Sequence, residues 1–213
     1  MTSKLHYISQ QSASLTHIAA IHRALDAGCV WVQLRVKHEQ ETVVARYAEE
    51  AKKLCALYGA KLIINDFPLI AKAVEADGVH LGLQDMPIQA ARDIVGESMV
   101  IGGTANTLEH IRQRTAEGAD YVGLGPYSFT TTKEKLSPVL GLEGYAAVLQ
   151  QLKAEGISIP IIAIGGLVAA DVVALLQTGV HGVAVSGAIT HATDPAAVVQ
   201  TIQQITSSST IAV

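Results

Sequence analysis

Residues 121–133 read Y-V-G-L-G-P-Y-S-F-T-T-T-K, a short apolar run that gives way at a Gly-Pro step to a stretch of hydroxyl groups and one cation. The apolar part, Tyr121 to Leu124, has the length and residue types of a buried strand. Hydroxyl and ammonium groups just after a strand can hold phosphate oxygens, because both donate hydrogen bonds and Lys133 adds a positive charge. The alternative for Thr130, Thr132 and Lys133 is a solvated turn, so the rest of the chain must decide.

The same arrangement recurs along the whole chain. Short apolar runs rich in β-branched residues alternate with longer amphipathic runs, usually with a glycine at the entry to each strand. The predicted strands are Leu5 to Ser9, Val30 to Val36, Lys61 to Asn65, Gly78 to Leu81, Met99 to Gly103, Tyr121 to Leu124, Ile159 to Ile164 and Gly182 to Ser186. The predicted helices are Thr16 to Ala27, Glu39 to Tyr58, Leu69 to Ala76, Ile88 to Val95, Leu108 to Glu117, Leu142 to Glu155, Ala169 to Leu176 and Pro195 to Ile205.

Alternating strands and helices predict an α/β fold, a single-domain (β/α)8 TIM barrel that spans residues 1–213. The length lies near the short end of the roughly 200 to 400 residues that this fold uses. An open doubly wound sheet is the alternative, and it is disfavoured because the spacing is even and no linker interrupts it. In a barrel, the loops that follow the strands form the active site.

Composition narrows the possible functions. The chain is 49% hydrophobic and 16% charged, so we expect a globular protein with a large core. A net charge of -4 without a basic run argues against nucleic acids and membrane surfaces as partners, so an anionic ligand must be held locally. Cys29 and Cys55 show neither metal-ligand spacing nor a disulfide framework, and Met1 to Tyr7 lacks the apolar core of a signal peptide, so we expect a reduced, cytoplasmic setting. The oligomeric state stays open, with a homo-oligomer as one option.

Three polar residues alternate along the second predicted strand. Gln33, Arg35 and Lys37 share one face, while the valines and the leucine between them share the other and should meet the helices. The polar face then rises along the lumen to its mouth, where a lone cation is costly unless an anion or a carboxylate meets it. The alternative is an Arg35 paired with a barrel carboxylate and a solvated Lys37.

Two carboxylates follow adjacent strands. Asp66 comes after the third strand, beside Asn65, and Asp85 comes shortly after the fourth. Near a polyphosphate such carboxylates suit Mg²⁺, which takes one or two protein carboxylates together with waters and substrate oxygens. The alternative for each aspartate is a cap on the next helix, and Asp85 before Met86-Pro87 fits that role.

Glycine-rich loops follow the seventh and eighth strands. In barrels of this kind these loops often bind phosphate through backbone N–H groups. Gly165, Gly166, Val185, Ser186 and Gly187 occupy that place. One anion site is therefore expected near the cations and aspartates and another near these loops, which suggests that two phosphorylated reactants meet.

Other chemistries lack a signature. The eight histidines are scattered without a metal-ligand spacing, and His80, inside the fourth strand, is interpreted as a satisfied core residue. There is no G-x-S-x-G elbow, no P-loop and no G-x-G-x-x-G after a strand, which disfavours hydrolases and nucleotide cofactors.

Taken together, the motifs resemble those of the thiamin phosphate synthases, a family of (β/α)8 barrels, from the second strand to the eighth. They are Gln33-Leu34-Arg35-x-Lys37, Ile64-Asn65-Asp66, Ala76-Asp77-Gly78-Val79-His80-Leu81-Gly82 followed by Asp85, Gly123-x-Gly125-Pro126, Thr130-x-Thr132-Lys133, Ile164-Gly165-Gly166 and Val185-Ser186. The chain departs from the family pattern at Leu83, where a Gln is usual, and at Thr104-Ala105-Asn106, where a Ser and a following His are common.

The resemblance implies a transferase that joins hydroxymethylpyrimidine pyrophosphate to a thiazole phosphate, in the carboxythiazole or hydroxyethylthiazole form, and releases pyrophosphate. By position it assigns contacts with the pyrimidine pyrophosphate to Gln33, Arg35, Lys37, Asn65, Thr104 and Lys133. It makes Asp66 and Asp85 the Mg²⁺ ligands. It assigns the thiazole phosphate to Thr130, Thr132, Gly166, Val185 and Ser186, with Gly165 in the same loop.

The implied chemistry is consistent with these residue types. An electron-rich pyrimidine supports positive charge on the carbon that loses pyrophosphate, so the step is expected to be dissociative. The catalytic task is then charge neutralisation, by Mg²⁺ with Arg35, Lys37 and Lys133. No general base is needed, which agrees with the lack of a histidine dyad.

Two rival functions remain. A phosphate-binding barrel isomerase, such as a thiazole tautomerase, would bind one phosphate and need a poised base. A non-catalytic module that binds a thiamin precursor is the other rival. The combination of Arg35, Lys37, Asp66, Asp85 and Lys133 favours the pyrophosphate reaction.

Overall fold

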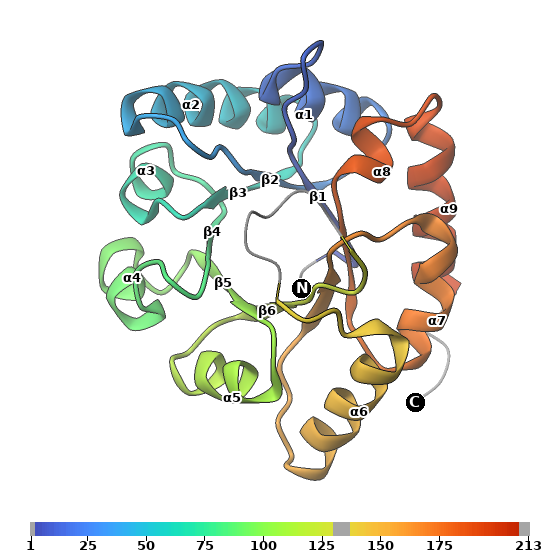
Figure 1. Cartoon of the computed structure of the whole chain (residues 1–213). Coiled ribbons are helices and arrows are strands. Elements are labelled where there is room, and N and C mark those ends of the chain that lie inside the picture. Colours follow the sequence, from blue (N-terminus) through green and yellow to red (C-terminus); the bar gives the residue numbers. More distant parts are fainter. Residues whose placement is uncertain (1–2, 130–136, 209–213) are drawn as a thin grey trace.

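Eight parallel strands close into a barrel, each paired with the next and β8 paired with β1 (Figure 1). The computed structural model describes residues 3–129 and 137–208. The strands are β1 (Leu5–Ile8), β2 (Trp31–Leu34), β3 (Lys61–Asn65), β4 (Gly78–Leu81), β5 (Val100–Ala105), β6 (Tyr121–Leu124), β7 (Ile161–Ile164) and β8 (Gly182–Val185). Closure confirms the predicted barrel and shows that the open doubly wound alternative is wrong.

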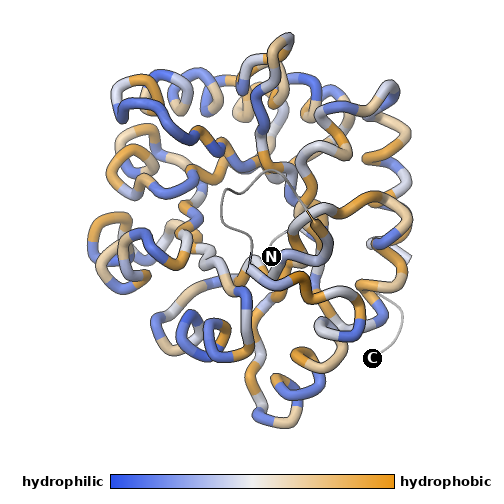
Figure 2. The backbone as a smooth tube through the Cα atoms, in the orientation of Figure 1, coloured by the Kyte–Doolittle hydropathy of each residue, from blue (hydrophilic) through white to orange (hydrophobic). Residues whose placement is uncertain are grey.

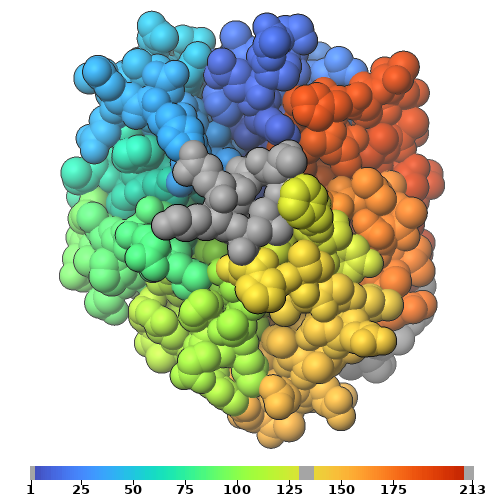
Figure 3. Space-filling model, in the orientation of Figure 1, coloured from blue at the N-terminus to red at the C-terminus, as the bar shows by residue number. Residues whose placement is uncertain are grey.

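Helices surround the barrel in chain order (Figure 1). The space-filling view, from the same side, shows the segments following one another in the same order around this face (Figure 3). They are α1 (His17–Asp26), α2 (Glu41–Leu57), α3 (Pro68–Ala73), α4 (Ile88–Val95), α5 (Leu108–Ala116), α6 (Gly141–Ala154), α7 (Val172–Gln177) and α9 (Pro195–Ser208). A 3-10 turn, η1 (Ala169–Asp171), precedes α7, so the predicted helix from Ala169 begins as this turn. The sequence reading missed the four-residue helix α8 (Gly187–Thr190), which follows β8.

The outer helices are amphipathic, with hydrophobic and hydrophilic residues mixed along each one (Figure 2). In α4 the buried residues are Ile88, Ala91 and Val95, a helical spacing that places them on one face. Gly96 ends this helix with a φ of 79°, a left-handed conformation that glycine adopts without strain. None of the helices in the described ranges combines the length and the apolar character that a bilayer span requires.

The strands separate two hydrophobic cores. The larger core joins the strands to the helices and includes Val32, Leu34 and Val36, as the alternation along the second strand predicted. The smaller one takes one residue from each of six strands, namely Ile8, Trp31, Ile63, Tyr121, Ile162 and Ala184. Because the strand neighbours of these six belong to the larger core, the smaller one fills the lumen. Cys29 and Cys55 are both free, buried thiols.

Aromatic rings fill the lower lumen. His6 stacks on Trp31 with ring centroids 3.8 Å apart, and Tyr121 meets Trp31 edge-on at 5.2 Å. The Tyr121 ring fits because residue 102 is glycine: a Cβ there would lie 2.1 Å from the Tyr121 Cζ atom. The size of this one ring therefore dictates the residue on the neighbouring strand.

We expect Gly102→Ala to destabilise the fold by about 2 kcal/mol or more, because the added methyl group overpacks a rigid core. Urea unfolding at neutral pH measures the change. In a double variant that also carries Tyr121→Leu, the smaller side chain leaves space for the methyl group, so the combined loss should be less than the sum of the single losses. Strictly additive losses would contradict the packing argument.

Candidate active site

Polar side chains from four neighbouring strand ends line a cavity of about 590 Å³ at the rim of the barrel. They come from the segments after β2 and β4 and from the ends of β3 and β5. The lining residues are Arg35, Lys37, Asn65, Asp66, Gly82, Leu83, Gln84, Asp85, Thr104, Asn106 and Ser137. We call this space the polar cavity.

Asp66 is held in the polar cavity by its backbone conformation and by Lys37. Its φ is 69°, in the left-handed region, and its N–H donates to the carbonyl oxygen of His80 at 2.9 Å. The Lys37 Nζ donates to an oxygen of the Asp66 carboxylate. Burial and a hydrogen bond with the Asp85 carboxyl nevertheless raise the pKa of Asp66 to about 6, although Lys37 opposes the shift. One ammonium group therefore does not balance the two carboxylates.

Asp85 faces Asp66 and does not cap a helix. Its Oδ2 accepts the N–H of Gly82 at 2.7 Å, and the following helix α4 has no side-chain cap. Helix α3, after Asp66, also lacks one. Burial acts to raise the pKa of Asp85, but the hydrogen bonds with Asp66 and with the Gly82 N–H lower it. The capping alternative is thus wrong for both aspartates.

The aspartate pair has the character of a divalent-cation site. Mg²⁺ typically binds one or two protein carboxylates and completes its coordination shell with waters and substrate oxygens. The two facing carboxylates of Asp66 and Asp85 fit this preference. The described residues contain no cluster of three or more His, Cys, Asp or Glu side chains that could hold a metal without such help. The donor set therefore fits a cation that arrives with a phosphate ligand.

Two buried amide groups on the adjacent strands β2 and β3, one of them at the cavity wall, lack partners among the described residues. The Nε2 of Gln33 and the Nδ2 of Asn65 have no hydrogen-bond partner among the described residues, although the side chains are only 2% and 6% exposed. An unsatisfied buried donor costs about 1 to 3 kcal/mol. A ligand that accepts from both amides would recover that free energy.

Thr104 is held from below by a chain of hydrogen bonds. The Nε2 of His80 lies 3.0 Å from the Thr104 Oγ1, and the His80 Nδ1 lies 3.0 Å from the Tyr121 hydroxyl. His80 is thus the satisfied core histidine that the sequence suggested. Its position in the lumen connects the aromatic core with the floor of the cavity.

A second cavity, of about 400 Å³, lies at the other side of the barrel mouth. We call it the glycine cavity. Among its lining residues are Gln10, Arg35, Pro126, Phe129, Gly165, Gly166, Leu167, Val185, Ser186, Gly187 and His191. Gly165 and Gly166 have φ values of 102° and 67°, and the Ser186 Oγ donates to Gln10 Oε1 at 3.2 Å.

Gly166 could not be replaced by a larger residue. An added Cβ would lie 2.2 Å from the Ser128 Oγ and 2.6 Å from the Phe129 carbonyl oxygen. The Ser128 hydroxyl also donates to the Gly166 carbonyl at 2.8 Å. The loop after β7 is thus packed directly against the segment that follows β6, and backbone lines this part of the cavity.

Arg35 is the one described residue that lines both cavities. Burial lowers the pKa of its guanidinium, and the charge of Asp66 opposes the shift only in part. Asn106 makes a second connection, because its Nδ2 in the polar cavity donates to the carbonyl of Gly125, which lines the glycine cavity. Ligands bound in the two cavities would therefore meet at Arg35.

The structure brings most of the predicted site residues together. Arg35, Lys37, Asn65, Asp66, Asp85 and Thr104 line the polar cavity, and Gly165, Gly166, Val185 and Ser186 line the glycine cavity. Gln33 is buried on the strand that leads to Arg35. Thr130, Thr132 and Lys133 lie outside the described residues.

The sequence reading missed several lining residues. Gln84 and Asn106 stand beside recognised motif positions, and their proximity to Asp85 and Thr104 could have identified them. Gln10 and His191 could not be found in this way, because they lie in loops without a pattern and meet only when β8 pairs with β1.

Comparison with known proteins identifies the family. A family model described as thiamine monophosphate synthase matches residues 5–189, which is most of the chain. The chain belongs to this family. The resemblance predicted from the motifs is thereby confirmed, and membership makes the chain an enzyme, a transferase of thiamine biosynthesis.

Individual members of the thiamine monophosphate synthase family are similar over nearly the whole chain. The thiamine-phosphate synthase of Flavobacterium johnsoniae is 48% identical and covers 96% of each chain. That of Flavobacterium psychrophilum is 51% identical over 92% of this chain and 95% of the relative. The solved thiamine phosphate pyrophosphorylase of Pyrococcus furiosus is 30% identical, covers 97% of this chain and 96% of that one, and superposes with a TM-score of 0.82.

The backbone of Arg35 is held in place by two residues outside the family motifs. The Arg35 N–H donates to the Ser9 Oγ at 3.0 Å, and the Ser9 Oγ lies 2.9 Å from the His17 Nδ1. Burial, with a contribution from the Arg35 charge, lowers the pKa of His17 to about 4. His17 is therefore neutral in the folded protein, and its ring also meets the edge of Tyr47 at 5.9 Å.

A neutral buried histidine makes stability depend on pH. His17 takes up a proton near pH 6.5 in the unfolded chain but only near pH 4 in the folded protein. Its contribution to the free energy of unfolding should therefore be fully present above pH 6.5 and should fall by up to about 3 kcal/mol as the pH drops towards 4. Urea unfolding at several pH values should show a shallower fall for His17→Asn than for the native chain. The exposed His22, replaced by Asn, is the control and should keep the native slope. An unchanged slope in His17→Asn would refute this origin.

Proposed function

We propose that the chain joins hydroxymethylpyrimidine pyrophosphate to a thiazole phosphate and releases pyrophosphate, giving thiamin phosphate. The observation that carries the proposal is the pair of cavities that meet at Arg35. One cavity is polar and contains two carboxylates, and the other is bounded by glycine backbone. This arrangement supports two anionic substrates side by side, whereas an isomerase needs room for only one.

The polar cavity is proposed to bind the pyrimidine pyrophosphate. The unpaired amides of Gln33 and Asn65 can donate to the acceptor nitrogens of a pyrimidine, and the Thr104 hydroxyl lies on the cavity wall. Arg35 and Lys37 supply positive charge for the pyrophosphate. Lys133, which lies outside the described residues, has the same proposed role.

Asp66 and Asp85 are the proposed ligands of Mg²⁺. When bound, the ion would neutralise charge on the pyrophosphate as it leaves. The environment of the pair supports this role, since burial and the adjacent Asp85 carboxyl raise the pKa of Asp66 and a cation there would offset both effects. Lys37 also keeps Asp66 in place, because its ammonium group donates to that carboxylate.

The glycine cavity is proposed to bind the thiazole phosphate. Gly165, Gly166, Val185 and Ser186 would hold its phosphate with backbone N–H groups and one hydroxyl, and Thr130 and Thr132 would complete the site. A phosphate anchored there turns the thiazole ring towards Arg35 and the polar cavity. Positioning of this kind makes the reaction effectively unimolecular.

The proposed step breaks the bond between the pyrimidine methylene carbon and the pyrophosphate oxygen. The electron pair leaves with pyrophosphate, and the pyrimidine ring carries the resulting positive charge. The lone pair of the thiazole nitrogen then forms the new carbon–nitrogen bond. Arg35 and Lys37 stabilise the departing anion, and no side chain has to remove a proton.

A direct assay tests this function. Protein incubated with both substrates and Mg²⁺ should produce pyrophosphate and thiamin phosphate in equal amounts. The yield of both products should fall to background if either substrate is left out. A tautomerised thiazole phosphate, pyrophosphate without thiamin phosphate, or binding without turnover would each reject the proposal in favour of an isomerase, a hydrolase or a binding module.

The metal assignment has its own test. Asp66→Asn and Asp85→Asn should each lower kcat/KM about 100-fold or more, because the ion supplies several kcal/mol of charge stabilisation. The unfolding free energy should change far less. Asp93→Asn is the matched control, since Asp93 lies on α4, outside both cavities, and its carboxylate accepts a hydrogen bond from the exposed Gln89 side chain. Full activity of the native chain under saturating chelator would exclude a metal.

A further inference from the structure

Arg114 is a buried cation outside both cavities. It belongs to α5, a helix of the outer layer, yet its side chain is only 3% exposed. Taking a guanidinium group out of water is costly unless its donors are paired. The role of this residue therefore depends on which groups its side chain contacts.

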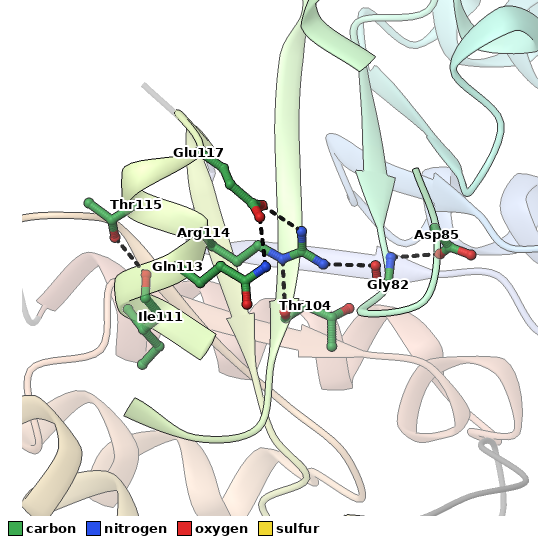
Figure 4. Close-up of polar contacts among 8 residues, drawn as sticks. All are labelled: Gly82, Asp85, Thr104, Ile111, Gln113, Arg114, Thr115 and Glu117. Atoms are coloured by element: carbon green, nitrogen blue, oxygen red, sulfur yellow. Dashed lines mark hydrogen bonds and ion pairs between the residues drawn. The ribbon is translucent and has the colours of Figure 1, made fainter. Parts of the chain in front are cut away.

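The guanidinium joins the ends of two neighbouring strands. Its Nη2 donates to the Gly82 carbonyl at 2.8 Å, its Nε donates to the Thr104 carbonyl at 3.3 Å, and its Nη1 donates to the Glu117 carboxylate at 2.8 Å (Figure 4). Gly82 follows β4 and Thr104 lies in β5. Glu117 thus orients the guanidinium from the helix side, and two backbone carbonyls receive its other donors.

Both carbonyls belong to residues of the polar cavity. The N–H of Gly82 donates to the Asp85 Oδ2 at 2.7 Å, so one residue connects Arg114 with the Asp85 carboxylate (Figure 4). The side chain of Thr104 lines the same cavity. A shift of either carbonyl would therefore move a group that faces the substrate.

The neighbouring strand is adapted to this side chain. A Cβ at residue 103 would lie 2.8 Å from the Arg114 Cδ and 3.1 Å from its Nε, so glycine is the residue that leaves room for it. This observation is independent of the hydrogen bonds. It indicates that the fold requires glycine at residue 103 to accommodate the Arg114 side chain.

We propose that Arg114 is a positioning residue, which sets the spacing between the Asp85 loop and Thr104 and thereby the geometry of the pyrophosphate side of the reaction. The inference rests on the proposed function. It assigns no such effect to the glycine cavity, because the hydrogen-bond partners of Arg114, namely Gly82, Thr104 and Glu117, do not line that cavity. Substitution of Arg114 is therefore expected to weaken binding of the pyrimidine pyrophosphate and to leave binding of the thiazole phosphate unchanged.

Two substitutions at Arg114 distinguish the effect of the planar guanidinium geometry from the effect of the positive charge. Arg114→Lys keeps a cation near Glu117, but one ammonium group cannot reproduce the planar fork that reaches both carbonyls. Arg114→Met removes the charge and keeps the length. Arg112→Met is the matched control on the same helix, since Arg112 is 41% exposed and pairs with Glu109 and Glu155, which line neither cavity.

Binding and kinetics are both measured. For Arg114→Lys we expect the Kd for inorganic pyrophosphate with Mg²⁺, from calorimetry, and the KM for the pyrimidine pyrophosphate to rise about tenfold, which is about 1.4 kcal/mol. The KM for the thiazole phosphate should stay within about twofold, and Arg112→Met should keep all three constants. Glu117→Gln, which retains Arg114 but weakens its orientation, should shift the same two constants by a smaller factor.

The outcomes distinguish the inference from the proposed function. A native chain that makes no thiamin phosphate rejects the proposed function, whereas the Mg²⁺-pyrophosphate Kd still reports on Arg114. Native constants in Arg114→Lys overturn the inference, and so do equal rises in both KM values. If Arg114→Met does not fold, the thermal midpoints of Arg114→Lys and Glu117→Gln show whether these two variants are folded, and the same criteria apply to them.

Discussion

Closure of the parallel barrel is the constraint on which the site depends. All eight strands point the same way and β8 pairs with β1, so their carboxyl ends form one continuous rim. Gln10, after the first strand, can meet Ser186, after the last, only because of this closure. The lumen below the rim is filled by rings and aliphatic side chains, which leaves the mouth as the place where polar groups from distant segments can gather.

The charged side chains at this rim do not neutralise one another completely. Lys37 pairs with Asp66, but burial and the nearby Asp85 carboxyl raise the pKa of that aspartate despite the ammonium group. The pKa of Arg35 is shifted in the opposite direction, because burial lowers it and the charge of Asp66 offsets that shift only in part. A site with an excess carboxylate on one side and an under-compensated guanidinium on the other suits a ligand that carries both a divalent cation and phosphate groups.

The sequence could predict what depends on local periodicity. Alternation along the second strand separated Gln33 and Arg35 from the valines that pack on the helices, and the structure confirms this division. Contacts across the barrel carry no local signal: nothing near His80 indicates that its ring joins Tyr121 to Thr104. Helix α8 was missed because four residues are too few to show a period. The sequence left a capping role open for Asp85, because it does not show whether the carboxylate points to the following helix or back to the preceding strand end.

Arg114 shows why residues outside the strand ends escape such reading. On the sequence it is an ordinary arginine in a polar helix, and the glycine that admits it lies eleven residues earlier, at 103. Only the packing of α5 against β5 brings the two together, and only then does the guanidinium reach the carbonyls of Gly82 and Thr104. The active site of a barrel is formed by loops, but loops alone do not fix the positions of the residues they carry. The precision of the rim must come from groups buried between strands and helices, and a forked cation that satisfies two strand-end carbonyls at once meets that requirement better than an apolar side chain could.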